Sequence, residues 1–170
     1  AASEAEWQDI RVSVEATQIA GPADNEYGIL MRMDGEGSFI AFSISGDGYA
    51  RVARYDEGVW SVLGPDWTPS LPINLGDATN RLEVSAQGSQ LEFRVNDELV
   101  RQVEDPEVRL GSIGLYAGAF SEGDVVVAFD NIAMYVSLAE DEVPPAGLGL
   151  EDAMANRLVF GRYRSRFVVV

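Results

Sequence analysis

One stretch of the chain collects side chains suited to carbohydrate recognition. Tyr49, Arg51 and Tyr55 recur at even spacing in an alternating segment, so they share one face of the strand predicted there. Trp60 lies in the next predicted strand, and Trp67 lies in the loop beyond it. Sugar rings stack on planar aromatic side chains, while their hydroxyl groups pair with carboxylates, amides and guanidinium groups. The five residues therefore predict a glycan-binding surface, unless the rings fill the core or cap its rim.

Oxygen-bearing residues in turns suggest a second kind of site. Asp24 and Asn25 lie in one oxygen-rich loop, and Asp130 lies near the end of the last predicted strand of the sandwich. Oxygen ligands of this kind are those that Ca²⁺ prefers. These three residues are the candidate ligands of a structural calcium ion, although Asp and Asn in turns often bond only their own backbone. No cofactor is required by the sequence.

The charge of the chain narrows the range of partners. Its 170 residues contain 28 acidic and 12 basic residues, for a net charge of -16, and they include no His or Cys. A surface this negative repels phosphates, so we expect no nucleic acid partner. Without His and Cys, a Ser-His-Asp triad, a Cys nucleophile and the common His-containing zinc sites are excluded. No apolar run approaches the ~20 residues needed to span a bilayer.

Short alternating segments separated by Gly, Asn and Asp recur through the first 138 residues. This pattern predicts an all-β fold, an antiparallel two-sheet jelly-roll sandwich, over residues 1–138. The predicted strands are Trp7–Ile19, Tyr27–Met33, Ser38–Ser45, Tyr49–Tyr55, Val59–Leu63, Arg81–Ala86, Gln90–Val95, Glu98–Val103, Ile113–Ala119 and Val125–Val136.

Several motifs in this region resemble those of laminin G-like, concanavalin A-like jelly-roll domains of bacterial surface proteins. They include the opening Trp7–Arg11, the Gly-x-x-x-Arg strand from Gly28 to Arg32, the Asn96-Asp97 turn and the closing Phe129–Ile132. Relatives with this pattern include sugar-binding modules and 3-keto-disaccharide hydrolase domains. The resemblance implies the same sandwich fold, glycans as ligands and a structural calcium ion.

Hydrolysis is the less favoured activity of such a fold here. Glycoside hydrolysis needs two carboxylates about 5 to 10 Å apart. The related family 16 glycosidases carry Glu-x-Asp-x-x-Glu on one strand, and this pattern is absent: Glu122-Gly123-Asp124 lacks the second Glu. Another pair, such as Glu83 and Glu92, stays open as an alternative, but the sequence predicts that the chain is not an enzyme.

The last 32 residues differ from the body in composition. Residues 139–149 are acidic and rich in Pro and Gly, which predicts a linker, and residues 150–170 form a C-terminal extension. We expect a short helix over Leu150–Phe160 and a strand over Tyr163–Val170. This strand carries the candidate interaction residues Arg162, Tyr163, Arg164, Arg166 and Phe167, which suit an edge strand that pairs with another chain in a homo- or hetero-oligomer. The alternative is that it folds back on its own acidic sandwich.

The chain begins Ala1-Ala2-Ser3, as an exported protein would after removal of a signal peptide. The sequence therefore predicts an extracellular or cell-surface, non-catalytic module for binding or adhesion, with a glycan or another surface protein as partner. The second reading is a structural subunit of a surface or membrane-associated assembly held through its C-terminal extension, and the third is a carbohydrate hydrolase.

Overall fold

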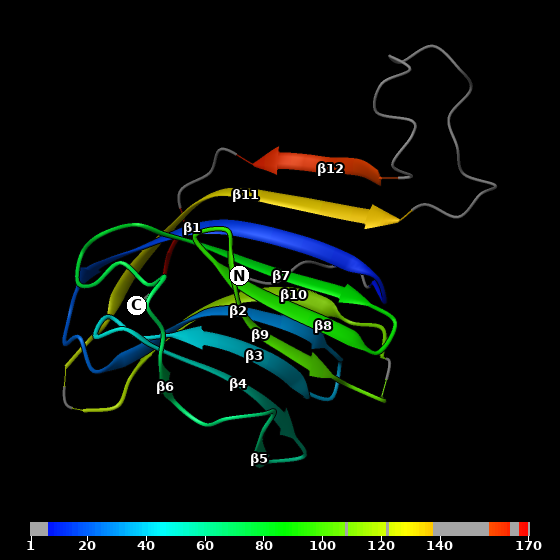
Figure 1. The fold of residues 1–170 in the computed structure, drawn as a ribbon, viewed down its shortest axis with the longest axis horizontal. Helices are drawn as coiled ribbons and strands as arrows, with labels where there is room; N and C mark the ends of the chain where they lie inside the picture. The colour runs from blue at the N-terminus through cyan, green and yellow to red at the C-terminus, as the bar shows by residue number, and fades with distance from the viewer. Residues whose placement is uncertain (1–6, 108, 122, 138–156, 164–166, 170) are drawn as a thin grey trace.

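The structure is a computed structural model that describes residues 7–107, 109–121, 123–137, 157–163 and 167–169. Two antiparallel β-sheets pack face to face (Figure 1), as the alternating pattern predicts. The seven-stranded sheet has the order β12 (Arg157–Tyr163), β11 (Val126–Ser137), β1 (Ile10–Ala20), β7 (Asn80–Gln87), β8 (Gln90–Val95) and β9 (Glu98–Glu104), with β13 (Phe167–Val169) also paired to β11. The six-stranded sheet has the order β10 (Ser112–Ala119), β2 (Asn25–Met33), β3 (Phe39–Ile44), β4 (Tyr49–Asp56) and β5 (Val59–Val62), with β6 (Thr68–Pro69) paired to β4.

The core lies between the sheets and follows the period-two alternation of the strands. On β1, Val12 and Val14 point inward and are almost completely buried. Phe42 of one sheet packs against Phe93 of the other, with ring centroids 5.1 Å apart. The opposite alternation therefore faces outward on each sheet, and these outer faces carry the polar and aromatic side chains.

Tight turns set the register of the hairpins. Between β8 and β9, Asn96 and Asp97 both have positive φ angles, of 50° and 70°. Asn and Asp tolerate this conformation, which matches the twist of the flanking strands in a two-residue hairpin. The tight turn predicted at this position is confirmed.

The helix predicted over Leu150–Phe160 is wrong where the structure describes it, because Arg157–Phe160 belong to β12. This strand pairs with the outer edge of β11 over Ile132–Ser137, and β13 pairs with the same edge over Val127–Phe129. An open edge presents unpaired backbone groups, and strand pairing satisfies them where a helix would not. Residues 139–149 and 150–156 lie outside the described residues.

The described parts of the C-terminal extension thus pair with the chain's own sheet. Tyr163 lies opposite Ile132, Arg162 opposite Ala133, and Phe167 opposite Phe129. This pairing fits the expectation that the extension folds back on its own sandwich, and gives no support to an oligomer formed through it. Arg164 and Arg166 lie outside the described residues.

Among the described residues, no helix has the length and apolar character required to cross a membrane.

Candidate functional site

The outer face of the six-stranded sheet brings the predicted glycan-binding residues together. On β4, Ala50 and Val52 are buried in the core, so the alternating Tyr49, Arg51 and Tyr55 point outward. We call this surface, with Trp60, Trp67 and Phe120, the aromatic face.

Three rings cluster at one end of the aromatic face. Tyr55 stacks on Phe39, its cross-strand partner on β3, with centroids 5.2 Å apart and planes 22° apart. Trp60, opposite Tyr55 on β5, lies 5.1 Å from the tyrosine ring. Trp60 is 47% exposed and Tyr49 is 38% exposed, so neither fills the core.

Arg51 lies at the centre of the aromatic face between two indoles. Its guanidinium carbon is 5.6 Å from the ring centroid of Trp60 and 4.8 Å from that of Trp67. A guanidinium over an indole face is attracted by the negative ring surface. Trp67 also meets Phe120 edge to face at 5.5 Å, and Phe120 is half-exposed. One strand and one loop therefore bring two indoles to the same cation, and Phe120 packs against the second of them.

A row of cross-strand neighbours leads from β10 through β2 and β3 to Arg51 on β4. The register places Tyr116 of β10 opposite Gly28 of β2, Gly28 opposite Ser43 of β3, and Ser43 opposite Arg51 of β4. The Tyr116 hydroxyl is hydrogen-bonded to Ser43 Oγ. Its ring therefore crosses β2 at the position where glycine leaves room for it.

Glu26 joins this row to the guanidinium. Its Oε2 atom is 3.2 Å from Arg51 Nη2 and accepts a hydrogen bond from the Tyr116 hydroxyl at 3.4 Å. We call Glu26, Ser43, Arg51 and Tyr116 the polar set. It is a compact group of one carboxylate, one guanidinium and two hydroxyls beside exposed rings.

Burial changes the proton affinity of the polar set. Desolvation raises the pKa of Glu26, and the opposing effects of Arg51 and the Tyr116 hydrogen bond only reduce the rise. Desolvation and the neighbouring Glu26 charge also raise the pKa of Tyr116, which stays protonated as a hydrogen-bond donor. The Glu26 carboxyl therefore takes up a proton at a higher pH than an exposed glutamate does.

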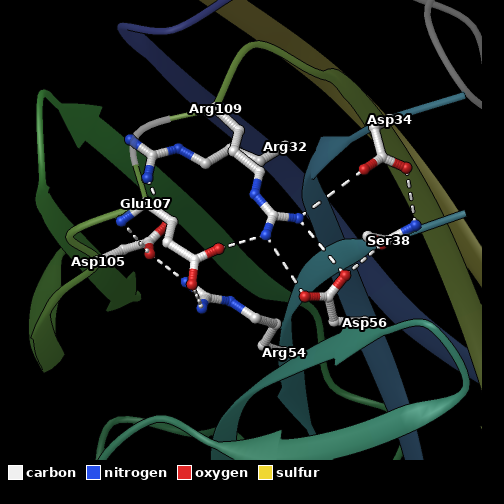
Figure 2. A network of polar contacts seen from close by, with 8 residues as sticks. All are labelled: Arg32, Asp34, Ser38, Arg54, Asp56, Asp105, Glu107 and Arg109. Atoms are coloured by element: carbon white, nitrogen blue, oxygen red, sulfur yellow. Dashed lines mark hydrogen bonds and ion pairs between the residues drawn. The ribbon is translucent and has the colours of Figure 1, made fainter. Parts of the chain in front are cut away.

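A second polar network lies where the chain passes from β9 to β10 (Figure 2). Arg32, which is 4% exposed, donates to Asp105 at 2.5 Å, and Arg54 also pairs with Asp105. Arg109 pairs with Asp56 at 3.4 Å and with Glu107.

The Asp105 carboxylate is 1% exposed, and both of its oxygens accept from arginine. The network joins the segment leaving the seven-stranded sheet to β2 and β4 of the other sheet. Its charges are paired with one another, so we assign it a structural role.

The candidate calcium ligands are not gathered at one place. Asn25 lies in β2 and donates to the carbonyl of Pro22 at 2.5 Å, while its side-chain oxygen accepts from Gly46 N at 3.1 Å. Asp130 lies in β11 of the other sheet and accepts from the backbone of Asn131. Asp24 is exposed. Within the described ranges, no group of three or more acidic residues has the arrangement of a metal site, and calcium binding stays a prediction.

Sequence reasoning missed five residues of the aromatic face and the polar set: Glu26, Phe39, Ser43, Tyr116 and Phe120. Alternation around the buried Tyr27 and Ile29 places Glu26 and Gly28 on the outer face. No local pattern pairs Glu26 with Tyr116, which follows it by 90 positions. Only the strand order connects them.

Comparison with solved structures identifies the architecture. A carbohydrate-binding module, CBM66 from Bacillus subtilis, is similar with a TM-score of 0.63 and 19% identity over 78% of each chain. The fold is a concanavalin A-like jelly roll. A Bacillus licheniformis β-glucanase is similar with a TM-score of 0.59 and 13% identity, over 81% of this chain and 70% of the other. Sheep galectin-11, in a complex with glycerol, has a TM-score of 0.56 and 12% identity, over 79% and 96%.

No family model and no curated protein sequence matches the chain. At these identities, similarity shows the fold and leaves function to the site.

Proposed function

We propose that this protein is a non-catalytic domain that binds glycans on the aromatic face. The observation that carries the proposal is Arg51, held between the indoles of Trp60 and Trp67 beside the carboxylate of Glu26. Exposed rings next to a few fixed polar groups are the composition that sugar recognition requires. The similarity to a carbohydrate-binding module and a galectin supports the same class of ligand.

The polar set favours binding over hydrolysis. Glycosidases that use carboxylates need two of them across the scissile bond. The polar set contains one carboxylate, Glu26, and that carboxylate is already engaged by Arg51 and Tyr116. The raised pKa of Tyr116 makes it a poor nucleophile.

The alternative catalytic pair, Glu83 and Glu92, lies on the seven-stranded sheet. Glu83 is paired with Arg11 at 3.3 Å, and Glu92 with Arg94 at 3.0 Å. Both carboxylates therefore have cationic partners, and the Glu83 side chain is also buried.

A glycan screen with the full chain tests the proposal. We expect binding of one or more oligosaccharides by the native protein. Trp60→Ala and Trp67→Ala should each weaken it by about tenfold or more, since buried aromatic anchors commonly contribute 2 kcal/mol or more to binding.

Tyr135→Ala is the matched control, because Tyr135 lies under Arg11 at 5.0 Å on the opposite face. Absence of binding to any glycan, or equal losses in all three variants, would refute the proposal. Release of reducing ends from a bound glycan would instead favour the hydrolase.

A further inference from the structure

The polar set has hydrogen-bonding capacity that the protein itself does not use. Both bonds to Glu26 end on Oε2, and Oε1 accepts none from the described residues. Arg51 donates to Glu26 through Nη2, whereas Nη1 donates to no described residue. Each of the two side chains is 18% exposed. The unused acceptor and the unused donor therefore belong to one ion pair, and both of its side chains reach solvent.

This arrangement fits a particular chemical group. Adjacent hydroxyls on a sugar ring can donate to a carboxylate oxygen and accept from a guanidinium at the same time. The ring that carries them would lie beside the indoles of Trp60 and Trp67, which flank Arg51. Stacking and paired hydrogen bonds would then act on one sugar residue.

The charge of the site opposes an anionic ligand. Glu26 already compensates the Arg51 charge at 3.2 Å, so a uronate carboxylate arriving at Arg51 would face the Glu26 carboxylate. The chain as a whole carries a net charge of -16 and adds to this repulsion. Like charges brought together at an interface select against the wrong ligand.

We propose that Glu26 and Arg51 form a subsite for a neutral sugar residue with two adjacent free hydroxyl groups, so that the aromatic face selects neutral over acidic glycans. This inference rests on the glycan binding proposed above. The subsite would recognise the pair of hydroxyl groups rather than one particular sugar.

Calorimetric titration of the native full chain tests the selectivity without any mutation. The neutral probes are cellohexaose, xylohexaose and β-1,4-mannohexaose, whose internal residues each keep two adjacent free hydroxyls, and the acidic probe is a hexamer of galacturonic acid, all at neutral pH and physiological ionic strength. We expect at least one neutral probe to bind about tenfold or more tightly than the acidic one. The same neutral probe methylated at its adjacent hydroxyls should lose most of its affinity.

A conservative variant tests the residues. Glu26→Gln keeps the size of the side chain and removes its charge, and we expect it to weaken the neutral probe by about tenfold, the loss typical of a hydrogen bond to a charged group. Glu92→Gln is the matched control, because Glu92 pairs with Arg94 on the opposite face, and it should bind as the native chain does. Thermal unfolding of both variants checks that they fold.

The outcomes separate this inference from the proposed function. Equal or tighter binding of the acidic hexamer, or unchanged affinity in Glu26→Gln, would overturn the neutral-diol subsite and leave glycan binding in place. No binding of any probe by the native chain, together with an empty glycan screen, would remove both.

Discussion

The two outer faces of the sandwich have the same backbone architecture and opposite chemistry. On the seven-stranded sheet, Arg11 and Arg81 both pair with Glu83, at 3.3 and 3.2 Å, and Arg94 pairs with Glu92 at 3.0 Å. The Arg81–Glu83 and Arg94–Glu92 pairs lie within one strand, and the Arg11–Glu83 pair joins two strands, so each of these charges has a partner of opposite sign. On the outer face of the six-stranded sheet, the Glu26–Arg51 ion pair lies among exposed rings, and among the described residues it keeps an unused donor and acceptor.

This difference between the two outer faces indicates which of them is better suited to bind a ligand. Charged groups that are already paired with each other on a sheet face leave few free groups for a ligand to bind. A face with half-exposed aromatic rings keeps apolar area in water and gains by covering it. This contrast supports the proposal that the aromatic face, rather than the outer face of the seven-stranded sheet, binds the glycan.

The first prediction compares how much a buried and an exposed ion pair contribute to the stability of the fold. Asp105→Ala should lower the free energy of unfolding by about 3 to 5 kcal/mol, because it leaves two arginines without their buried partner. Glu92→Ala on the seven-stranded face should cost less than about 1 kcal/mol. Denaturation in urea measures both free energies of unfolding. Equal losses in the two variants would contradict the distinction between the buried network and the exposed Arg94–Glu92 pair.

The second prediction concerns Gly28, a backbone position of the strand that carries Glu26. A Cβ at position 28 would collide with the carbonyl oxygen of Phe42, beneath the ring of Tyr116. Gly28→Ala should therefore cost about 1 to 3 kcal/mol of stability, as overpacking does, and weaken glycan binding as well.

Gly35→Ala is its control, because a Cβ there meets nothing within 4 Å. It should change stability by no more than about 0.5 kcal/mol. A Gly28→Ala protein as stable as the native chain would mean that the strands can separate to admit the methyl group.

The third and smallest prediction concerns pH. The ionised Glu26 is the form that accepts a hydroxyl hydrogen bond, and burial raises its pKa although Arg51 of β4 and Tyr116 of β10 face it. Affinity for a neutral glycan should therefore fall as the pH drops through this raised pKa, above the range where an exposed Glu titrates. Calorimetry across this range should show the fall in the native chain and a flat profile in Glu26→Gln.

The free energy of unfolding should change with pH in the opposite direction to the affinity, increasing as the pH drops through the raised pKa of Glu26. Because the pKa of Glu26 is raised on folding, the folded protein holds this proton more tightly than the unfolded chain does. The stabilising effect of that proton is complete below the unfolded pKa and is lost as the pH rises through the folded pKa. The difference in unfolding free energy between the native chain and Glu26→Gln isolates it, and a difference that does not vary with pH would contradict the raised pKa.

Period-two alternation, a local property, determined the strands, the two-sheet sandwich and the shared face of Tyr49, Arg51 and Tyr55. The tight turn at Asn96-Asp97, where both residues have positive φ angles, could also be predicted from the sequence, since turn chemistry depends on the residues in the turn itself. The helix predicted at Arg157–Phe160 failed because the sequence does not show that the open edge of β11 is available for pairing.

Tertiary structure alone decided what surrounds Arg51. Glu26 and Tyr116 meet because β2 lies beside β10, and Trp67 reaches the guanidinium from a loop whose path no local pattern specifies. Side-chain alternation is set by backbone geometry within a strand, whereas the choice of neighbours depends on strand order and register across the whole sandwich. The sequence by itself therefore determined which residues face outward, and only the folded sheet decided which of them form a site.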